Sequence, residues 1–117
     1  MSVAYDLFQQ GRNHLQQGMA AQATVALEKA KRLEPEKASI RESLGIAYFR
    51  IRRWAEAEAE FRALLELAPA DDYAHYALGR TLEKLGRAAE ANGHYKLASS
   101  LRPGSKQYAR RIRELEA

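Results

Sequence analysis

A period of 34 residues runs through this chain and constrains its fold more than any other feature. The only three prolines, Pro35, Pro69 and Pro103, are 34 residues apart. A glycine, an alanine and a large apolar residue recur with the same period, at Gly11, Gly45 and Gly79, at Ala23, Ala57 and Ala91, and at Leu27, Phe61 and Tyr95. Self-similarity at this interval is typical of arrays in which each repeat is one supersecondary unit packed against its neighbours.

Apolar residues between the turns follow helical spacing and predict six helices in three pairs. Ser2 is a predicted N-cap of the first helix, and Asp71 or Asp72 is a predicted N-cap of the fifth. Gly93 lies inside the sixth helix, where glycine costs about 1 kcal/mol relative to alanine. The predicted ranges are 3–17, 20–33, from Pro35 to about 51, 54–67, about 72–85 and 88–101.

The C-terminal stretch predicts a seventh helix that closes the array. Tyr108, Ile112 and Leu115 have helical spacing and the residues between them are mostly charged. A repeat array exposes its last apolar face unless a terminal element with a polar exterior covers it. The sequence therefore predicts an all-α protein of seven helices.

The Leu-Gly pairs at 44–45 and 78–79, followed on the same period by alanine, a large apolar residue and proline, resemble the tetratricopeptide repeat (TPR). The resemblance implies a right-handed superhelical array of three helix-turn-helix pairs plus a C-terminal capping helix. It also implies one domain over residues 1–117, with repeats at about 4–37, 38–71 and 72–105 and a capping helix at about 105–116. Short stand-alone chains of this kind look like bacterial TPR proteins, some without an assigned role.

In the TPR family the first helix of each pair lines a concave groove that binds extended peptides or partner helices. Aromatic residues and arginine, which are enriched at binding hot spots, occur at many of the matching positions here. We therefore predict a protein partner whose segment is acidic or C-terminal and carries an apolar anchor. Packing against adjacent helices is the alternative role for Leu15, Tyr5, Phe49, Tyr73 and Tyr76. The predicted groove residues are Tyr5, Phe8, Arg12, Phe49, Arg50, Tyr73, Tyr76, Arg80, Lys84, Arg110 and Arg111.

One family mechanism can be compared with the sequence directly. TPR co-chaperones hold the carboxylate of heat-shock proteins with Lys and Asn in the first repeat, Asn in the second, and Lys and Arg in the third. The matching positions here are Phe8, Arg12, Ser43, Tyr73 and Ala77. Only Arg12 could serve, and it replaces an Asn, so we predict that this carboxylate clamp is absent.

Catalytic and cofactor chemistry find no support in the sequence. The chain has no cysteine, no glycine-rich phosphate loop and three histidines, which fall on three different predicted helices. Glu56, Glu58 and Glu60 are expected to form a solvated face of the fourth helix. We therefore predict no enzyme activity, no metal site and no cofactor.

Charge and hydropathy leave two alternatives to peptide binding. The chain lacks a membrane-spanning apolar run and a signal pattern, so a cytoplasmic location is expected. We also expect a monomer or a weak homo-oligomer. Its net charge of +4 is mild and does not demand nucleic acid. Self-assembly is one alternative and RNA binding is the other. RNA binding would use a basic face made of Arg50, Arg52, Arg53, Arg80, Lys84, Arg87, Arg110, Arg111 and Arg113.

Overall fold

The computed structural model describes residues 2–117; Met1, the first residue of the predicted domain, lies outside the described residues. This range contains seven helices and no strand, which confirms the all-α, seven-helix prediction. None of these helices has the length and apolar content that a membrane crossing requires. The helices are α1 (Val3–Gln16), α2 (Ala20–Leu33), α3 (Ala38–Arg50), α4 (Trp54–Leu67), α5 (Asp72–Lys84), α6 (Ala88–Leu101) and α7 (Lys106–Glu116).

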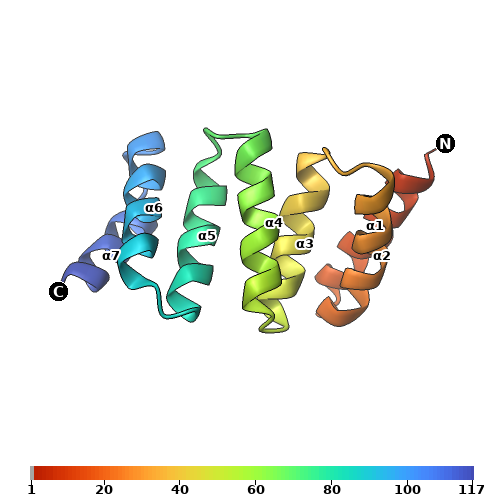
Figure 1. Cartoon of the computed structure of the whole chain (residues 1–117), viewed down its shortest axis with the longest axis horizontal. Coiled ribbons are helices and arrows are strands. Elements are labelled where there is room, and N and C mark those ends of the chain that lie inside the picture. Colours follow the sequence, from red (N-terminus) through yellow and green to blue (C-terminus); the bar gives the residue numbers. More distant parts are fainter. Residues whose placement is uncertain (1) are drawn as a thin grey trace.

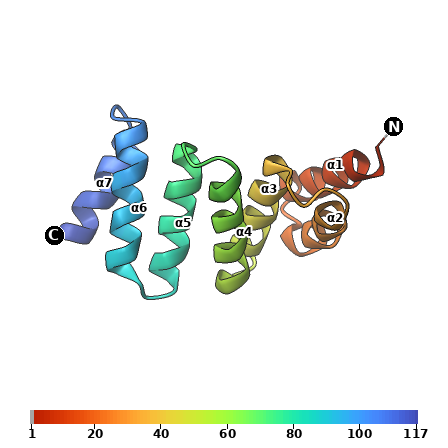
Figure 2. The same cartoon turned by 45° about the horizontal axis from the view of Figure 1, so that its top comes forward.

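The helices stand side by side in chain order and form an elongated body of 48 × 25 × 21 Å (Figures 1 and 2). Each helix packs mainly against the next one along the chain, and α7 covers α6 at the C-terminal end. The helices α1, α3 and α5 open the three pairs, and α2, α4 and α6 complete them.

Side-chain caps fix the start of three helices, α1, α5 and α7. At α7 the Ser105 hydroxyl accepts a hydrogen bond from the Tyr108 N–H at 3.2 Å. The Ser2 hydroxyl accepts a hydrogen bond from the Tyr5 N–H at 3.2 Å, and an Asp71 carboxylate oxygen accepts one from the Ala74 N–H at 3.1 Å. Asp71, rather than Asp72, is therefore the cap of α5. The predicted bounds of α2, α4 and α6 are confirmed, and α1, α3 and α5 each end one residue earlier than expected. The third helix also begins later than predicted, at Ala38 rather than at Pro35, because residues 35 and 36 form a turn.

The turn inside each pair needs one residue in the left-handed backbone region. Gly18 and Gly86 occupy this position with φ values of 75° and 78°. Arg52 takes the same position in the middle pair with a φ of 66°, where a side chain is sterically disfavoured. The turn geometry is thus retained even where the sequence does not supply glycine.

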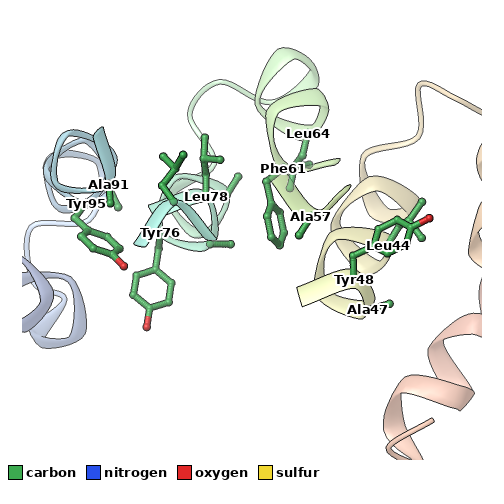
Figure 3. Packing of buried hydrophobic residues seen from close by; sticks show 14 of the residues in the cluster. Leu44, Ala47, Tyr48, Ala57, Phe61, Leu64, Tyr76, Leu78, Ala91 and Tyr95 are labelled. Carbon is green, nitrogen blue, oxygen red and sulfur yellow. The ribbon is translucent and has the colours of Figure 1, made fainter. Parts of the chain in front are cut away.

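The repeated small and large residues form the core. All nine residues of the repeated glycine, alanine and large apolar positions are buried, so the residues that define the 34-residue period are core residues. A side chain at Gly45 would meet the Phe61 ring at 2.6 Å, and one at Gly79 would meet the Tyr95 ring at 2.5 Å. Figure 3 shows Phe61 and Tyr95 projecting from α4 and α6 into the interior. The glycines are needed because a ring of the paired helix lies directly on the backbone.

The prediction that Glu56, Glu58 and Glu60 form a solvated face is wrong for Glu60. This residue is only 4% exposed, and its two carboxylate oxygens accept hydrogen bonds from Lys31 and Arg41, each at 2.9 Å. A buried carboxylate requires such partners, because removing its charge from water is costly. Glu60 therefore joins α2, α3 and α4.

Gly93 gives a first testable prediction. It lies in the interior of α6, and a side chain built there meets no atom within 4 Å. Gly93→Ala should therefore stabilise the protein by about 1 kcal/mol, because alanine loses less backbone entropy in a helix. Urea unfolding monitored by circular dichroism measures this gain, and an equal or lower unfolding free energy would contradict it.

Candidate functional site

Three adjoining hollows run along the surface formed by α1, α3 and α5. The central hollow has a volume of about 180 Å³ and lies between α3 and α5. Its lining combines aromatic rings with two guanidinium groups, so it offers both apolar surface and positive charge. The lining residues are Ile46, Phe49, Arg50, Phe61, Tyr73, Tyr76, Ala77 and Arg80.

Two further hollows extend the central one toward the N-terminus. The middle hollow, of about 300 Å³, lies between α1 and α3 and shares Ile46 and Arg50 with the central one. The N-terminal hollow, of about 360 Å³, shares Phe8 and Ser39 with the middle one. Because neighbouring hollows share walls, we name the three together the trough. It runs past the first helix of every pair.

Cations in the trough lie over aromatic rings. The Arg80 guanidinium is 5.7 Å from the centroid of Phe49, and the Arg12 guanidinium is 5.7 Å from that of Phe8. These separations are those of cation–π contacts. Arg50 Nη1 donates a hydrogen bond to the Leu15 carbonyl oxygen at 3.0 Å.

The same cations lack acidic partners. Within residues 2–117, no carboxylate lies within 4 Å of the guanidinium nitrogens of Arg12, Arg50 or Arg80. By contrast, Arg62 of α4 and Arg87, which directly precedes α6, each pair with two glutamates. The trough therefore keeps positive charge available to a ligand.

Glu42 is the acidic residue in the middle hollow. Burial raises its pKa, and the neighbouring Asp71 charge acts in the same direction, while Arg12 opposes both. The carboxyl group is thus easier to protonate than an ordinary glutamate. An anionic ligand would meet less repulsion here once Glu42 is neutral.

The predicted aromatic residues differ in how accessible they are. Tyr5 and Tyr73 are 56% and 39% exposed. Tyr76 is only 7% exposed, and its ring packs against Tyr95 at 5.8 Å and Tyr108 at 5.2 Å between centroids (Figure 3 labels Tyr76 and Tyr95). Most of the Tyr76 ring therefore packs against neighbouring helices, which is the alternative role considered for it above. Its hydroxyl accepts hydrogen bonds from Gln107 and Arg80.

The structure brings most, but not all, of the predicted groove residues into the trough. Eight of the eleven line its hollows, whereas Lys84, Arg110 and Arg111 do not. Lys84 lies 5.7 Å from the Trp54 ring. The two arginines of α7 pair with Glu114, at 3.7 and 3.6 Å. The eight are Tyr5, Phe8, Arg12, Phe49, Arg50, Tyr73, Tyr76 and Arg80.

Sequence reasoning missed parts of the trough wall. Ile40, Glu34 and Lys37 line the N-terminal hollow because the turn between α2 and α3 closes it. Phe61 lines the central hollow although its repeated position indicated packing alone. No motif marks these residues as part of a hollow, because their place in its wall depends on how neighbouring pairs meet.

The predicted basic face is divided by ion pairs. Four of its nine residues contact carboxylates of the chain: Arg53, Arg87, Arg110 and Arg111. The remaining cations include Arg50 and Arg80 of the trough. Acidic partners thus interrupt the positive surface that RNA binding would need.

Comparisons with known proteins agree on the fold. A solved structure of the first TPR of Spaghetti (RPAP3) bound to the HSP90 peptide SRMEEVD has a TM-score of 0.91 at 22% identity, covering 97% of this chain and 90% of that one. The second TPR domain of human RPAP3, in complex with the HSP70 peptide SGPTIEEVD, has a TM-score of 0.92 at 20% identity, with coverages of 98% and 96%. MamA from Desulfovibrio magneticus RS-1 reaches 0.93 at 21% identity, with coverages of 97% and 64%.

Sequence comparison identifies the family. No curated protein matches this chain. The family model described as tetratricopeptide repeat matches twice, over residues 8–72 and 44–106, and so covers most of the sequence. Together with seven helices arranged as consecutive pairs, this match gives a direct conclusion. The chain belongs to the tetratricopeptide repeat family.

Proposed function

We propose that this chain is a non-catalytic adaptor that holds a segment of a partner protein in the trough. TPR domains are generally non-catalytic, and their members typically mediate protein–protein interactions. The observation that carries the proposal is the central hollow, where exposed aromatic surface adjoins arginines without acidic partners. We further propose that residues 1–117 act as one module of three repeats, at 4–37, 38–71 and 72–105, and a cap at 105–116.

The chemistry of the central hollow defines the segment that would fit. Phe49 and Tyr73 offer apolar surface to one side chain, and half-burial of an aromatic ring contributes on the order of 1–2 kcal/mol. Arg50 and Arg80 can each hold a carboxylate through two parallel hydrogen bonds. The favoured ligand is therefore an acidic segment with an apolar anchor. We expect micromolar affinity, about 8 kcal/mol.

The peptides bound by structural neighbours support a peptide ligand for this chain and also limit which kind of peptide is expected. Two of the neighbours with known structures hold the acidic peptides SRMEEVD and SGPTIEEVD. The five positions that match the heat-shock carboxylate clamp hold Phe8, Arg12, Ser43, Tyr73 and Ala77 in this chain. We therefore expect an acidic partner segment of a different kind, bound through the central hollow.

The decisive experiment compares the intact protein with a trough variant, Tyr73→Ala with Arg80→Glu. Both side chains line the central hollow, and Tyr73 is exposed enough for its truncation to leave the fold intact. Tyr76 stays unchanged because it packs in the core. In affinity capture from nuclease-treated lysate of the source cell, followed by mass spectrometry, the variant should lose the partner.

A charge change in the middle hollow should strengthen binding, whereas the trough variant should abolish it. Glu42→Gln removes the acidic group there, so affinity for the captured acidic segment should rise about threefold to tenfold at pH 7. Titration calorimetry with a synthetic peptide of that segment measures the change. Unchanged or weaker binding would show that the segment does not lie along the middle hollow.

A matched control separates the trough from the general surface. Leu97→Ala with Arg113→Glu removes an exposed apolar residue and reverses an exposed cation outside the trough. This control should capture the partner as the intact protein does. Capture that occurs only in a parallel sample without nuclease would instead favour RNA. A molecular mass that rises with protein concentration in sedimentation would favour self-assembly.

A further inference from the structure

Two histidines meet where α5 packs on α6, outside the trough. The Nδ1 atoms of His75 and His94 are 3.1 Å apart, the ring centroids are 5.4 Å apart, and the ring planes differ by 24°. The centroid separation exceeds the nitrogen separation by about one ring diameter. The two nitrogens therefore lie between the rings and point at each other, which is the geometry of a nitrogen–nitrogen hydrogen bond.

A backbone carbonyl sets which ring donates. His75 Nε2 lies 3.1 Å from the Pro69 carbonyl oxygen, which can only accept, so Nε2 carries the proton. In the neutral ring His75 Nδ1 is then an acceptor. His94 must therefore donate its Nδ1–H to complete the contact. One hydrogen atom between the two rings thus satisfies the hydrogen-bonding capacity of both Nδ1 atoms.

The same two positions carry an ion pair one repeat earlier. Residues 34 positions before His75 and His94 are Arg41 and Glu60. Arg41 Nε donates to the Pro35 carbonyl oxygen at 2.9 Å, and Arg41 Nη1 donates to Glu60 at 2.9 Å. The third helix pair thus repeats the contacts of the second. In both, a proline carbonyl oxygen contacts a side chain of the first helix, which in turn contacts a side chain of the second helix. The third helix pair replaces opposite charges with two imidazoles.

We propose that the His75–His94 contact is an acid-sensitive clasp that fastens α5 to α6 and opens when both rings are protonated. A protonated imidazole is a donor at both nitrogens. With both rings charged, two N–H groups and two positive charges face each other across the contact. The clasp then changes from an attraction into a repulsion, which the Arg41–Glu60 pair cannot do at the same pH.

The charges around the pair do not cancel this repulsion. Arg62 of α4 adds positive charge, and Glu90 of α6 adds negative charge but is already paired with Arg62 and Arg87. Burial, His75 and Arg62 together lower the pKa of His94, against the smaller effect of Glu90. Because the unfolded state then binds more protons, stability declines as the pH falls below about 6.5, the ordinary histidine value.

A metal ion does not account for the pair. Within residues 2–117, no group of three or more histidine, cysteine or acidic side chains converges to hold one. The head-on arrangement of the two nitrogens also leaves room for a hydrogen rather than for an ion with bonds of about 2.0 Å to each nitrogen. The proton is thus the ligand that fits.

Hydrogen exchange of the intact protein at pH 7 and pH 5, with a chelator present, tests the clasp. After correction for intrinsic exchange, amides of α5 and α6 should lose at least about tenfold in protection, while those of α1 to α4 lose much less. The matched variant combines His75→Arg with His94→Glu, which installs the ion pair of the second repeat. In this variant the extra loss should disappear.

Two results would overturn the proposal. One is an equal loss of protection in α5 and α6 of the variant and of the unmodified protein. The other comes from nitrogen NMR of the unmodified protein at pH 7.5, where His75 should carry its proton on Nε2 and His94 on Nδ1. Protons on Nε2 of both rings would show that the clasp does not form, whether or not the variant folds.

Discussion

Glu60→Ala is expected to lower the free energy of unfolding by about 3 kcal/mol. The Glu60 side chain is 6% exposed, and its removal leaves Lys31 of α2 and Arg41 of α3 without their shared acceptor. Those two side chains are 24% and 20% exposed, so water relieves part of the loss. The effect should therefore fall near the lower end of that for a fully buried pair, which is about 3–5 kcal/mol.

Glu66→Ala is the matched control for this prediction. Glu66 is on the same helix, is exposed, and forms no ion pair within residues 2–117. Its replacement should change stability by no more than about 0.5 kcal/mol. Urea unfolding of both variants provides the comparison. A Glu60→Ala loss below about 1 kcal/mol would mean that the two cations find equivalent partners in water.

Gly79→Ala is expected to destabilise the protein by about 3 kcal/mol through overpacking. The added methyl group would lie 2.5 Å from Tyr95 Cε1 and 2.8 Å from its Cδ1. The Tyr95 ring has little freedom to move, because it is fully buried and its hydroxyl donates a hydrogen bond to Glu83. Strain in the α5–α6 contact is the expected cause.

A double-mutant cycle attributes this loss to the ring. Replacing Tyr95 with leucine removes the atoms that the methyl group would meet, so Gly79→Ala should cost much less in a Tyr95→Leu background. Gly104→Ala is the neutral control, because a side chain there meets nothing within 4 Å. Additive losses in the cycle would contradict the close-approach explanation.

The helices were predictable because their ends are chemically marked. Proline follows each second helix, and glycine or arginine occupies each inner turn, so the bounds of α2, α4 and α6 follow from the sequence alone. The first helices were placed less well at their C-terminal ends. Residues 17, 51 and 85 still have apolar or helix-compatible side chains, and only the turn geometry ends each helix before them.

Glu60 shows what sequence spacing alone could not resolve. Its position three residues after Ala57 and four before Leu64 places it on the buried face of α4. A charged residue there is acceptable only because Lys31 and Arg41 arrive from two other helices. A signal did exist, because residues 41 and 60 differ together from residues 75 and 94, which occupy the same two positions one repeat later. Arg41 is matched by Glu60 in the second repeat, and His75 is matched by His94 in the third, so each pair of residues identifies its own contact.

The trough was predictable in outline from the resemblance. The resemblance implied its aromatic and arginine residues, because the groove-facing positions of the family fall on one face of each first helix. The spacing could not tell that Tyr76 lies mostly in the core or that the arginines of α7 pair with Glu114. These outcomes depend on side chains of other helices, which periodicity does not specify.

The chain-order packing of the seven helices has a consequence for how the protein folds. Because each helix touches mainly its neighbours in the sequence, few contacts require a long loop to close first. Proteins rich in such local contacts fold in microseconds to milliseconds. Folding can start at any pair and spread in both directions. A nascent chain could therefore complete α1 to α4 while its remaining helices are still being synthesised.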